Sequence, residues 1–377
     1  MYPALAVLKA LQAQDESISA SDEVASPGDR GQQEVVWIGG EKGIEIDLLS
    51  REDVTLEIIP AAGVHGVGIR ALPGNLWDLF KGFFAARRII KDFQPDVLFL
   101  TGGYLAVPVA VAGWLASRSQ QRSLAVYVPD IEPGLALRVT ARLSDQILVT
   151  VEESMEYFND QANLIVTGYP TRQDLTAIPR DEAIARFMLS PELPTLLVFG
   201  GSKGARSINQ AILSILPELL QDLQVIHISG NLDWPTVKEV SNKLPGNIRD
   251  RYHSFPYLYK EMGAALNTAD LVVSRAGAAV LGEFPLYGVP AILVPYPHAW
   301  RYQEINAHYL ESRGAAIVLQ DHELGMHLYS TITRLVNDPQ MLREMSQAMS
   351  SLATPQAAES IANILQDLVH SPSSGRI

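Results

Sequence analysis

The chain of 377 residues contains no cysteine. Disulfide bonds and thiolate metal ligands are therefore excluded, and the stability of the fold has to come from packing and hydrogen bonding. A cysteine-free sequence also fits a reducing compartment.

Positive charge is scarce as well. The 29 Lys and Arg residues stand against 42 Asp and Glu residues, which gives a net charge of −13 at pH 7. A surface with this excess of negative charge repels the phosphates of a polynucleotide, which argues against sequence-independent nucleic-acid binding. We therefore expect no nucleic acid among the partners.

Long hydrophobic runs are missing. The longest, residues 105–116, contains Pro108 and falls well short of the about 20 residues that a membrane-spanning helix needs. Hydrophobic residues nevertheless make up 47% of the chain, which is enough for two domains that each have a core.

Apolar segments of strand length alternate with helical segments in both halves of the chain. This rhythm predicts two doubly wound α/β domains with parallel sheets. A Gly/Pro break at 167–172 separates the halves, so we place an N-terminal domain at 1–168 and a C-terminal domain at 169–353, followed by a final amphipathic helix at 354–370. Residues 15–34 are polar and aperiodic, and we predict a flexible surface insert there.

Residues 270–307 carry the strongest functional pattern. An apolar run at 271–273 predicts a strand buried on both faces, and the turn at 275–278, Arg-Ala-Gly-Ala, offers backbone N–H groups to an anion at a helix N-terminus. Glu283 in the next helix could accept both hydroxyls of a ribose. Gln303 and Asn306 share a helix face and could offer amides to a sugar. A helix-starting glutamate and a solvated helix face are the alternative interpretation.

A second glycine-rich turn, Gly-Gly-Ser-Lys-Gly-Ala-Arg at 200–206, joins a predicted strand to a predicted helix. Its N–H groups, the Ser202 hydroxyl and the helix dipole could meet a diphosphate. The motif differs from the P-loop because no Gly-Lys-Ser/Thr follows at the required spacing. Close packing of strand and helix is the alternative.

Residues 76–93 predict a helix that mixes aromatic and basic side chains. Such a helix suits an interfacial contact with anionic lipid, and a core helix with a basic outer face is the alternative. The residues of this predicted patch are Trp77, Phe80, Phe83, Phe84, Arg87 and Arg88.

Together these motifs resemble the MurG-type family of bacterial glycosyltransferases, which add N-acetylglucosamine to lipid I to make lipid II. The resemblance covers nearly the whole chain and is strongest in its second half. It implies the GT-B fold, in which two Rossmann-like domains face each other across a cleft, with the helix at 354–370 packed back on the N-terminal domain. The donor-binding residues that it implies are Arg172, Gly201, Ser202, Leu258, Ala278, Glu283, Gln303 and Asn306.

The resemblance also implies an acceptor side. Gly102, Gly103 and Tyr104 follow a predicted strand and would face the diphosphate of the acceptor, although a plain strand-to-helix turn explains them too. At 128–130 the chain has Val-Pro-Asp where the family has Glu-Gln-Asn, so the acceptor stays open. Asp130 is a candidate polar or basic group near the acceptor hydroxyl, and a cap for a helix at 134–143 is the alternative.

The chain joins the family pattern late, at Tyr2. The family begins with a strand and a glycine-rich turn that ends in His, its proposed catalytic base, and this His would fall just before Met1. We therefore expect a truncated or mis-started chain without its first strand, whose neighbours would expose unpaired edges. The catalytic residue is unknown.

The implied activity is an inverting transfer of N-acetylglucosamine from UDP-GlcNAc to the C4 hydroxyl of lipid I, by a peripheral protein on the cytoplasmic face of the bacterial cell membrane. Its partners would be a UDP-sugar, a polyprenyl-diphosphate-linked acceptor and an anionic membrane surface. We expect no cofactor and no metal, since Asp-x-Asp pairs are absent near the motifs. The alternatives are a transferase with a diacylglycerol-type acceptor, an inactive UDP-sugar-binding homologue and a UDP-sugar 2-epimerase.

Overall fold

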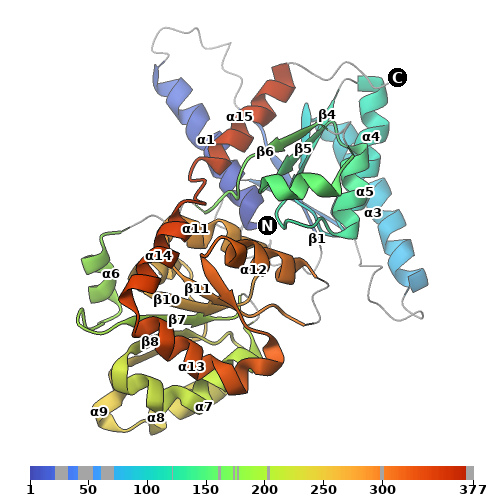
Figure 1. The fold of residues 1–377 in the computed structure, drawn as a ribbon. Coiled ribbons are helices and arrows are strands. Elements are labelled where there is room, and N and C mark those ends of the chain that lie inside the picture. Colours follow the sequence, from blue (N-terminus) through green and yellow to red (C-terminus); the bar gives the residue numbers. More distant parts are fainter. Residues whose placement is uncertain are drawn as a thin grey trace. The chain divides into compact units, whose positions relative to one another are not determined.

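The computed structural model describes residues 1–21, 33–40, 54–60, 72–120, 122–159, 163–172, 175, 178–201, 204–297 and 301–370. The chain divides into two compact units (Figure 1). Unit 1 is Met1–Pro170 with Gln356–Ile377, and unit 2 is Thr171–Pro355. The domain limits expected from the sequence, after residues 168 and 353, lie close to the ends of these ranges.

The described residues of unit 1 form two parallel sheets. The larger sheet has the order β3 (Val97–Leu100), β4 (Ser123–Val128), β5 (Gln146–Val149) and β6 (Leu164–Val166). The smaller is a pair, β1 (Val36–Gly40) and β2 (Thr55–Ile59). Among the described residues, β1 and β3 each have a strand partner on one edge only. The missing first strand stays a prediction.

Helices cover both faces of the larger sheet, as a parallel sheet requires. On β4, Leu124, Val126 and Val128 pack against one helical layer, whereas Ala125 and Tyr127 pack against the other. The first layer comprises α3 (Leu72–Phe93), α4 (Ala106–Gln120) and α5 (Leu135–Leu143). The second layer comprises α1 (Tyr2–Ser21) and α15 (Ala357–His370), and a short 3-10 helix, η1 (Glu152–Tyr157), follows β5.

Helix α1 corrects one prediction. It continues through Ser21, so residues 15–21 are helical and do not begin a flexible insert; residues 22–32 lie outside the described residues. The helix outlasts its apolar stretch because it lies along α15. Small alanines of both helices form one cluster, and the Gln14 Nε2 donates to Asn363 Oδ1 at 2.8 Å.

Unit 2 is built on one parallel sheet of six strands, in the order β12-β11-β10-β7-β8-β9. The strands are β7 (Thr195–Phe199), β8 (Gln224–Ile228), β9 (Tyr252–Phe255), β10 (Leu271–Ser274), β11 (Ala291–Leu293) and β12 (Ala316–Val318). The helices are α6 (Arg180–Arg186), α7 (Arg206–Asp222), α8 (Trp234–Lys243), α9 (Gly246–Arg249), α10 (Met262–Thr268), α11 (Glu283–Tyr287), α12 (Tyr302–Ser312), α13 (Leu324–Val336) and α14 (Pro339–Ser350), with 3-10 helices η2 (Ala278–Leu281) and η3 (Asp321–Glu323).

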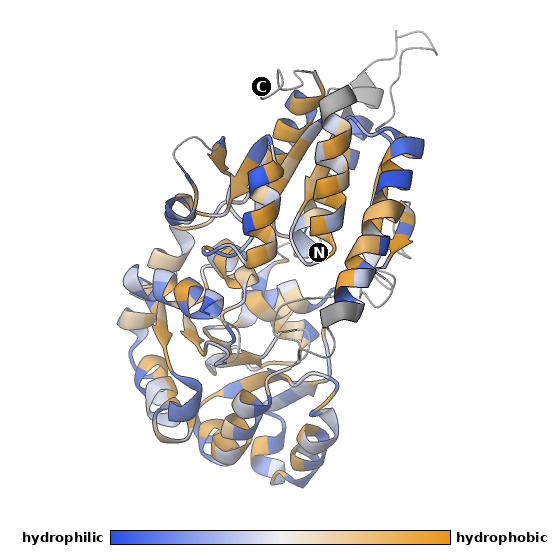
Figure 2. Cartoon of the chain, turned by 90° about the vertical axis from the view of Figure 1, so that its right-hand side faces the viewer, coloured by the Kyte–Doolittle hydropathy of each residue, from blue (hydrophilic) through white to orange (hydrophobic). Residues whose placement is uncertain are grey.

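Buried strands explain why this sheet forms. Most residues of β7, β8 and β10 are apolar and buried on both faces, with His227 in β8 as an exception, and Figure 2 shows mostly hydrophobic strands beside helices of mixed hydropathy. The main core joins one sheet face to α7, α8 and α13, through residues such as Val198, Ile212 and Leu328. On the other face, Phe284 of α11 makes an edge contact with Phe199 of β7 at 6.0 Å between ring centroids.

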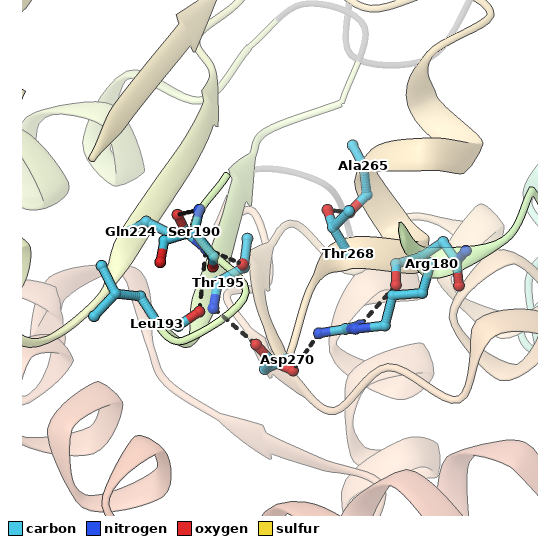
Figure 3. A network of polar contacts seen from close by, with 9 residues as sticks. Arg180, Ser190, Leu193, Thr195, Gln224, Ala265, Thr268 and Asp270 are labelled. Atoms are coloured by element: carbon cyan, nitrogen blue, oxygen red, sulfur yellow. Dashed lines mark hydrogen bonds and ion pairs between the residues drawn. The ribbon is translucent and has the colours of Figure 1, made fainter. Parts of the chain in front are cut away.

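A polar network holds the amino-terminal ends of the central strands together (Figure 3). The Asp270 carboxylate accepts hydrogen bonds from the Thr195 N–H at 2.8 Å and from Arg180 Nη2 at 2.7 Å. The Gln224 amide donates to the Thr195 hydroxyl at 3.0 Å and to the Ser190 carbonyl at 2.8 Å. These bonds fix the starts of β7, β8 and β10, so the opposite, carboxyl ends are carried by a rigid scaffold.

In the described part of the chain, no helix is long and apolar enough to cross a membrane.

Candidate functional site

The strand order of unit 2 identifies where a ligand would bind. From β7 the chain proceeds to β8 and β9 on one side, and then returns to β10 on the other side. In open α/β sheets, ligands bind beyond the carboxyl ends of the strands at such a switch point. Phe199 at the end of β7 pairs with Ser274 at the end of β10. The two turns predicted from the sequence therefore start side by side.

In the turn after β7, the structure describes the glycines on both sides of residues 202–203. Gly201 and Gly204 have φ values of +85° and +75°, and the Gly204 N–H donates to the Gly201 carbonyl at 3.0 Å. A Cβ on Gly204 would lie 2.4 Å from the Ser229 carbonyl oxygen, whereas a Cβ on Gly201 would meet nothing within 4 Å. The turn thus packs closely on one side, is open on the other, and leads into α7. Ser202 lies outside the described residues.

Arg275, in the turn after β10, ties several elements of the site together. Its side chain is buried and forms an ion pair with Asp321 of η3 at 2.5 Å. It also donates to Ser207 Oγ on the first turn of α7 at 2.7 Å, and to the carbonyls of Val294 and Pro295 at 3.2 and 3.3 Å. Ser207 in turn donates to Asp321 at 2.8 Å. One guanidinium therefore fixes both turns and the segment after β11, through a fork of donors that lysine lacks.

Glu283 lies where the helix after this turn is interrupted. Ala278 opens the 3-10 helix η2, which ends at Gly282 with φ −125° and ψ −48°, and Glu283 then begins α11. The sequence suggested one continuous helix, and the structure has two short pieces. The Glu283 side chain is mostly buried at this break, on the carboxyl side of β10.

Helix α12 places its two predicted amides differently. Gln303 is half-buried, and its Oε1 accepts a hydrogen bond from the Tyr296 N–H at 2.9 Å. Asn306 is fully buried, and its Nδ2 donates to the Ala276 carbonyl at 3.1 Å. Asn306 therefore supports the turn after β10, and its role toward a sugar stays a prediction. Both side chains act on the backbone that surrounds the switch point.

Two further residues predicted to bind the donor, Leu258 and Arg172, lie at other places in unit 2. Leu258 is buried in the segment that follows β9, at the same carboxyl edge as the two turns but beyond β8. Arg172 is half-buried near the start of the unit, and its carbonyl accepts from the Leu175 N–H at 3.1 Å. Their roles toward a nucleotide stay predictions.

In unit 1 the predicted acceptor residues follow neighbouring strands. Gly102, Gly103 and Tyr104 come after β3, and Asp130 comes after β4, with which β3 is paired. Gly102 has φ +99°, and a Cβ there would lie 3.2 Å from the Leu137 side chain, so the turn packs on α5. The N-cap of α5 is Gly134, without a side-chain cap, so the interpretation of Asp130 as the cap of this helix is wrong.

Helix α3 exposes a ladder of aromatic side chains. Trp77, Phe80 and Phe84 are 60%, 52% and 50% exposed, and their neighbouring rings lie 5.4 and 4.8 Å apart. Phe83 is half-buried and packs on the core of unit 1. Arg87 and Arg88 are exposed on the same helix. Helix α3 thus has a core face and a separate apolar surface.

Sequence reasoning missed the residues that hold the site. Ser207 and Asp321 are ordinary polar residues in the sequence, and only the fold brings them to Arg275. His227 is easier to recognise as a residue with a structural role, since it is a polar residue in the middle of a fully buried strand and such residues need hydrogen-bond partners. In the described ranges, no three His, Asp or Glu side chains are grouped as a metal site would require.

Comparison with solved structures first identifies the fold class of the protein. The structure matches the crystal structure of Acinetobacter baumannii MurG with a TM-score of 0.69 and 23% identity, covering 97% of this chain and 95% of that one. A putative UDP-N-acetylglucosamine 2-epimerase from Listeria monocytogenes gives a TM-score of 0.64 at 15% identity, covering 100% and 97%. At these identities the likeness concerns the fold, which is the GT-B fold with two Rossmann-like domains.

Sequence comparison then defines the family. Residues 195–363 match the glycosyltransferase family 28 C-terminal domain, and residues 29–119 match the family 28 N-terminal domain. A protein of Roseiflexus sp. (strain RS-1), named UDP-N-acetylglucosamine--N-acetylmuramyl-(pentapeptide) pyrophosphoryl-undecaprenol N-acetylglucosamine transferase, is 38% identical, over 98% of this chain and 92% of its own length. A relative of the same name from Desulforamulus reducens is 33% identical, over 98% and 95%. The chain belongs to the MurG-type transferases of glycosyltransferase family 28.

Proposed function

We propose that this protein transfers N-acetylglucosamine from UDP-GlcNAc to the C4 hydroxyl of lipid I, which forms lipid II for peptidoglycan synthesis. The observation that carries the proposal is the switch-point site of unit 2, where two glycine-containing turns start from paired strand ends. The names of the relatives support the choice of donor and acceptor.

The donor diphosphate fits the turn after β7. Backbone N–H groups around Gly201 and the N-terminus of the long helix α7 favour negative charge that gathers on departing UDP. Glu283 is proposed to accept the ribose hydroxyls, with Leu258 at the uracil and Gln303 near the sugar. Asn306 enters the proposal as a support of the turn through its bond to Ala276. Arg172 and Ser202 complete the proposed diphosphate contacts.

The reaction is a single displacement. The C4 oxygen of the acceptor forms a bond to the anomeric carbon, the bond from that carbon to the UDP oxygen breaks, and UDP leaves with the electron pair. The acceptor proton passes to a base, which raises the nucleophilicity of the oxygen. Asp130 is a candidate for that base, at the edge of unit 1 that also carries Tyr104. UDP-GlcNAc acts as a substrate, and the scheme uses no cofactor.

The lipid acceptor calls for contact with a membrane, and α3 supplies a suitable surface. Its three exposed rings offer apolar contact, while Arg87 and Arg88 add positive charge to an acidic protein. Ion pairs of Lys81 with Asp78 and of Arg88 with Asp92 offset part of this charge. We propose peripheral binding to the cytoplasmic face of the cell membrane, with the rings as the main contact.

Transfer of radiolabel from UDP-GlcNAc tests the proposal. The full chain is incubated with lipid I or with diacylglycerol in matched vesicles, and we expect labelled lipid II only. Label on diacylglycerol would overturn the proposed acceptor. Binding of UDP-GlcNAc without transfer to either lipid would indicate the inactive homologue, and conversion of UDP-GlcNAc to its 2-epimer without a lipid would indicate the epimerase.

A further inference from the structure

A buried histidine links three elements next to the switch point. His227 lies in the middle of β8 and is fully buried. Its Nδ1 is 2.7 Å from the Tyr252 hydroxyl on β9, and its Nε2 is 3.0 Å from Asn209 Oδ1 on α7. The Asn209 Nδ2 donates to the Ser229 carbonyl and to Asp233 Oδ2, both at 2.9 Å.

Only one arrangement of protons satisfies this network. The Asn209 amide nitrogen donates to two oxygens, so its Oδ1 is an acceptor and His227 Nε2 has to carry the hydrogen. Burial lowers the pKa of His227 to about 4, so the ring is neutral and Nδ1 accepts from Tyr252. Burial also raises the pKa of Tyr252, which keeps its hydroxyl proton in place. Both ring nitrogens of His227 and both amide atoms of Asn209 then have a hydrogen-bond partner.

The network ends at the glycine-rich turn. The Ser229 carbonyl, which accepts from Asn209, is the atom that a Cβ on Gly204 would meet at 2.4 Å. The Asp233 carboxylate accepts from Asn209 through one oxygen and from Arg206 Nε, at the start of α7, at 3.1 Å through the other. The path from β9 through β8 thus fixes both the first turn of α7 and the surface against which Gly204 packs.

We propose that His227 and Asn209 are positioning residues, which hold Gly204 and the first turn of α7 in the geometry that binds the donor diphosphate. The proposal rests on the proposed function of this site. A fully satisfied polar network fixes one arrangement, whereas apolar side chains of similar volume would fill the same space without directional bonds. Its contacts at the ligand side reach Gly204 and α7, and its bond to Tyr252 lies on β9, before the segment that carries Leu258, so we expect its main effect on the diphosphate.

A matched pair of substitutions at His227 separates the two ring nitrogens. In His227→Gln, the side-chain amide reaches the place of Nε2 and can still donate to Asn209. In His227→Asn, the shorter amide reaches only the place of Nδ1, so the bond to Asn209 is lost. Calorimetry with UDP and with uridine, which lacks the diphosphate, measures affinity, and thermal melting reports folding.

We expect His227→Gln to keep the ratio of UDP affinity to uridine affinity. His227→Asn should lower this ratio about tenfold, equivalent to about 1.4 kcal/mol. An unchanged ratio in His227→Asn, or an equal loss of both ligands, would overturn the proposal. If the native chain binds no UDP, the proposed function itself fails, so the two failures are distinguishable.

A second variant covers the case in which His227→Asn does not fold. Asp233 lies at the outer end of the network with a partly exposed side chain, so Asp233→Ala leaves the buried ring in place. It removes the acceptor that joins Asn209 to Arg206 and should lower the same ratio. A ratio equal to that of the native chain would also overturn the proposal.

Discussion

Replacement of Arg275 by methionine should loosen unit 2 at the switch point. Methionine has a similar length but no donor, so the change removes the ion pair to Asp321 and the hydrogen bonds to Ser207, Val294 and Pro295. The carboxylate of Asp321 is then left without its guanidinium partner. An uncompensated charge of this kind is the main cost of breaking a buried pair.

The structure sets the expected size of this loss. Removal of one partner of a buried pair costs about 3–5 kcal/mol. The Arg275 side chain is 10% exposed, but Asp321 keeps 22% exposure and its bond from Ser207, so we expect the lower end, about 3 kcal/mol. Arg186→Met is the matched control, because the Arg186–Glu182 pair is 42% and 56% exposed. That change should cost under about 1 kcal/mol.

Hydrogen exchange in a urea series, read by mass spectrometry on peptides from β7 and β10, measures the opening free energy of unit 2 separately from unit 1. Equal losses for Arg275→Met and Arg186→Met would refute the reasoning. Asp321→Asn should be destabilising alone but nearly neutral in the Arg275→Met chain, because residues that share one network are not additive. Additive costs would show that the two side chains do not act together.

Three further predictions address the donor, the membrane and pH. Glu283→Ala should weaken UDP binding in calorimetry by about 2 kcal/mol, because charge-assisted hydrogen bonds are lost. The surface control Glu182→Ala should leave the UDP affinity unchanged. An unchanged affinity in Glu283→Ala would reject its assignment to the ribose. The four basic residues of α3 are Lys81, Arg87, Arg88 and Lys91. Replacement of all four by glutamine should reduce co-sedimentation of the protein with anionic vesicles but not with neutral ones. Full retention on anionic vesicles would place the membrane-binding surface elsewhere. Because unfolded His227 takes up a proton near pH 6.5 and the folded ring only near pH 4, stability should fall as the pH drops between these values, by about 3 kcal/mol in all. His227→Gln should lack this slope in urea melts, and a parallel pH profile would contradict the assignment.

The sequence predicted the parts of the site that local pattern controls. The glycine turns after β7 and β10 were visible because only certain residues allow a tight strand-to-helix turn with open N–H groups. The apolar run at 271–273 indicated a strand buried on both faces, and it is buried in the structure. The βα alternation common to both halves indicated the fold class, because it follows from strand and helix periods alone.

Where helices and strands pack on one another, the structure differs from what the local sequence pattern indicated. Helix α1 continues past its apolar stretch because α15 lies along it, and residues 357–370 are remote in the chain. The segment after β10 looked like one helix, yet Gly282 interrupts it and places Glu283 at the start of a second piece. The amide of Asn306 is fully buried because the turn that it holds lies directly beside α12.

By itself, the amino-acid sequence determined that the chain forms two βα domains and where its glycine turns and its ribose-binding candidate lie. Only the tertiary structure decided what holds them, because hydrogen bonds such as Ser207 with Arg275 join residues 68 positions apart. The proton order of the His227 network likewise depends on three elements that meet in the folded core. Local sequence patterns predict turns and buried segments, whereas the strand order of the sheet determines which residue becomes the partner of a buried polar group.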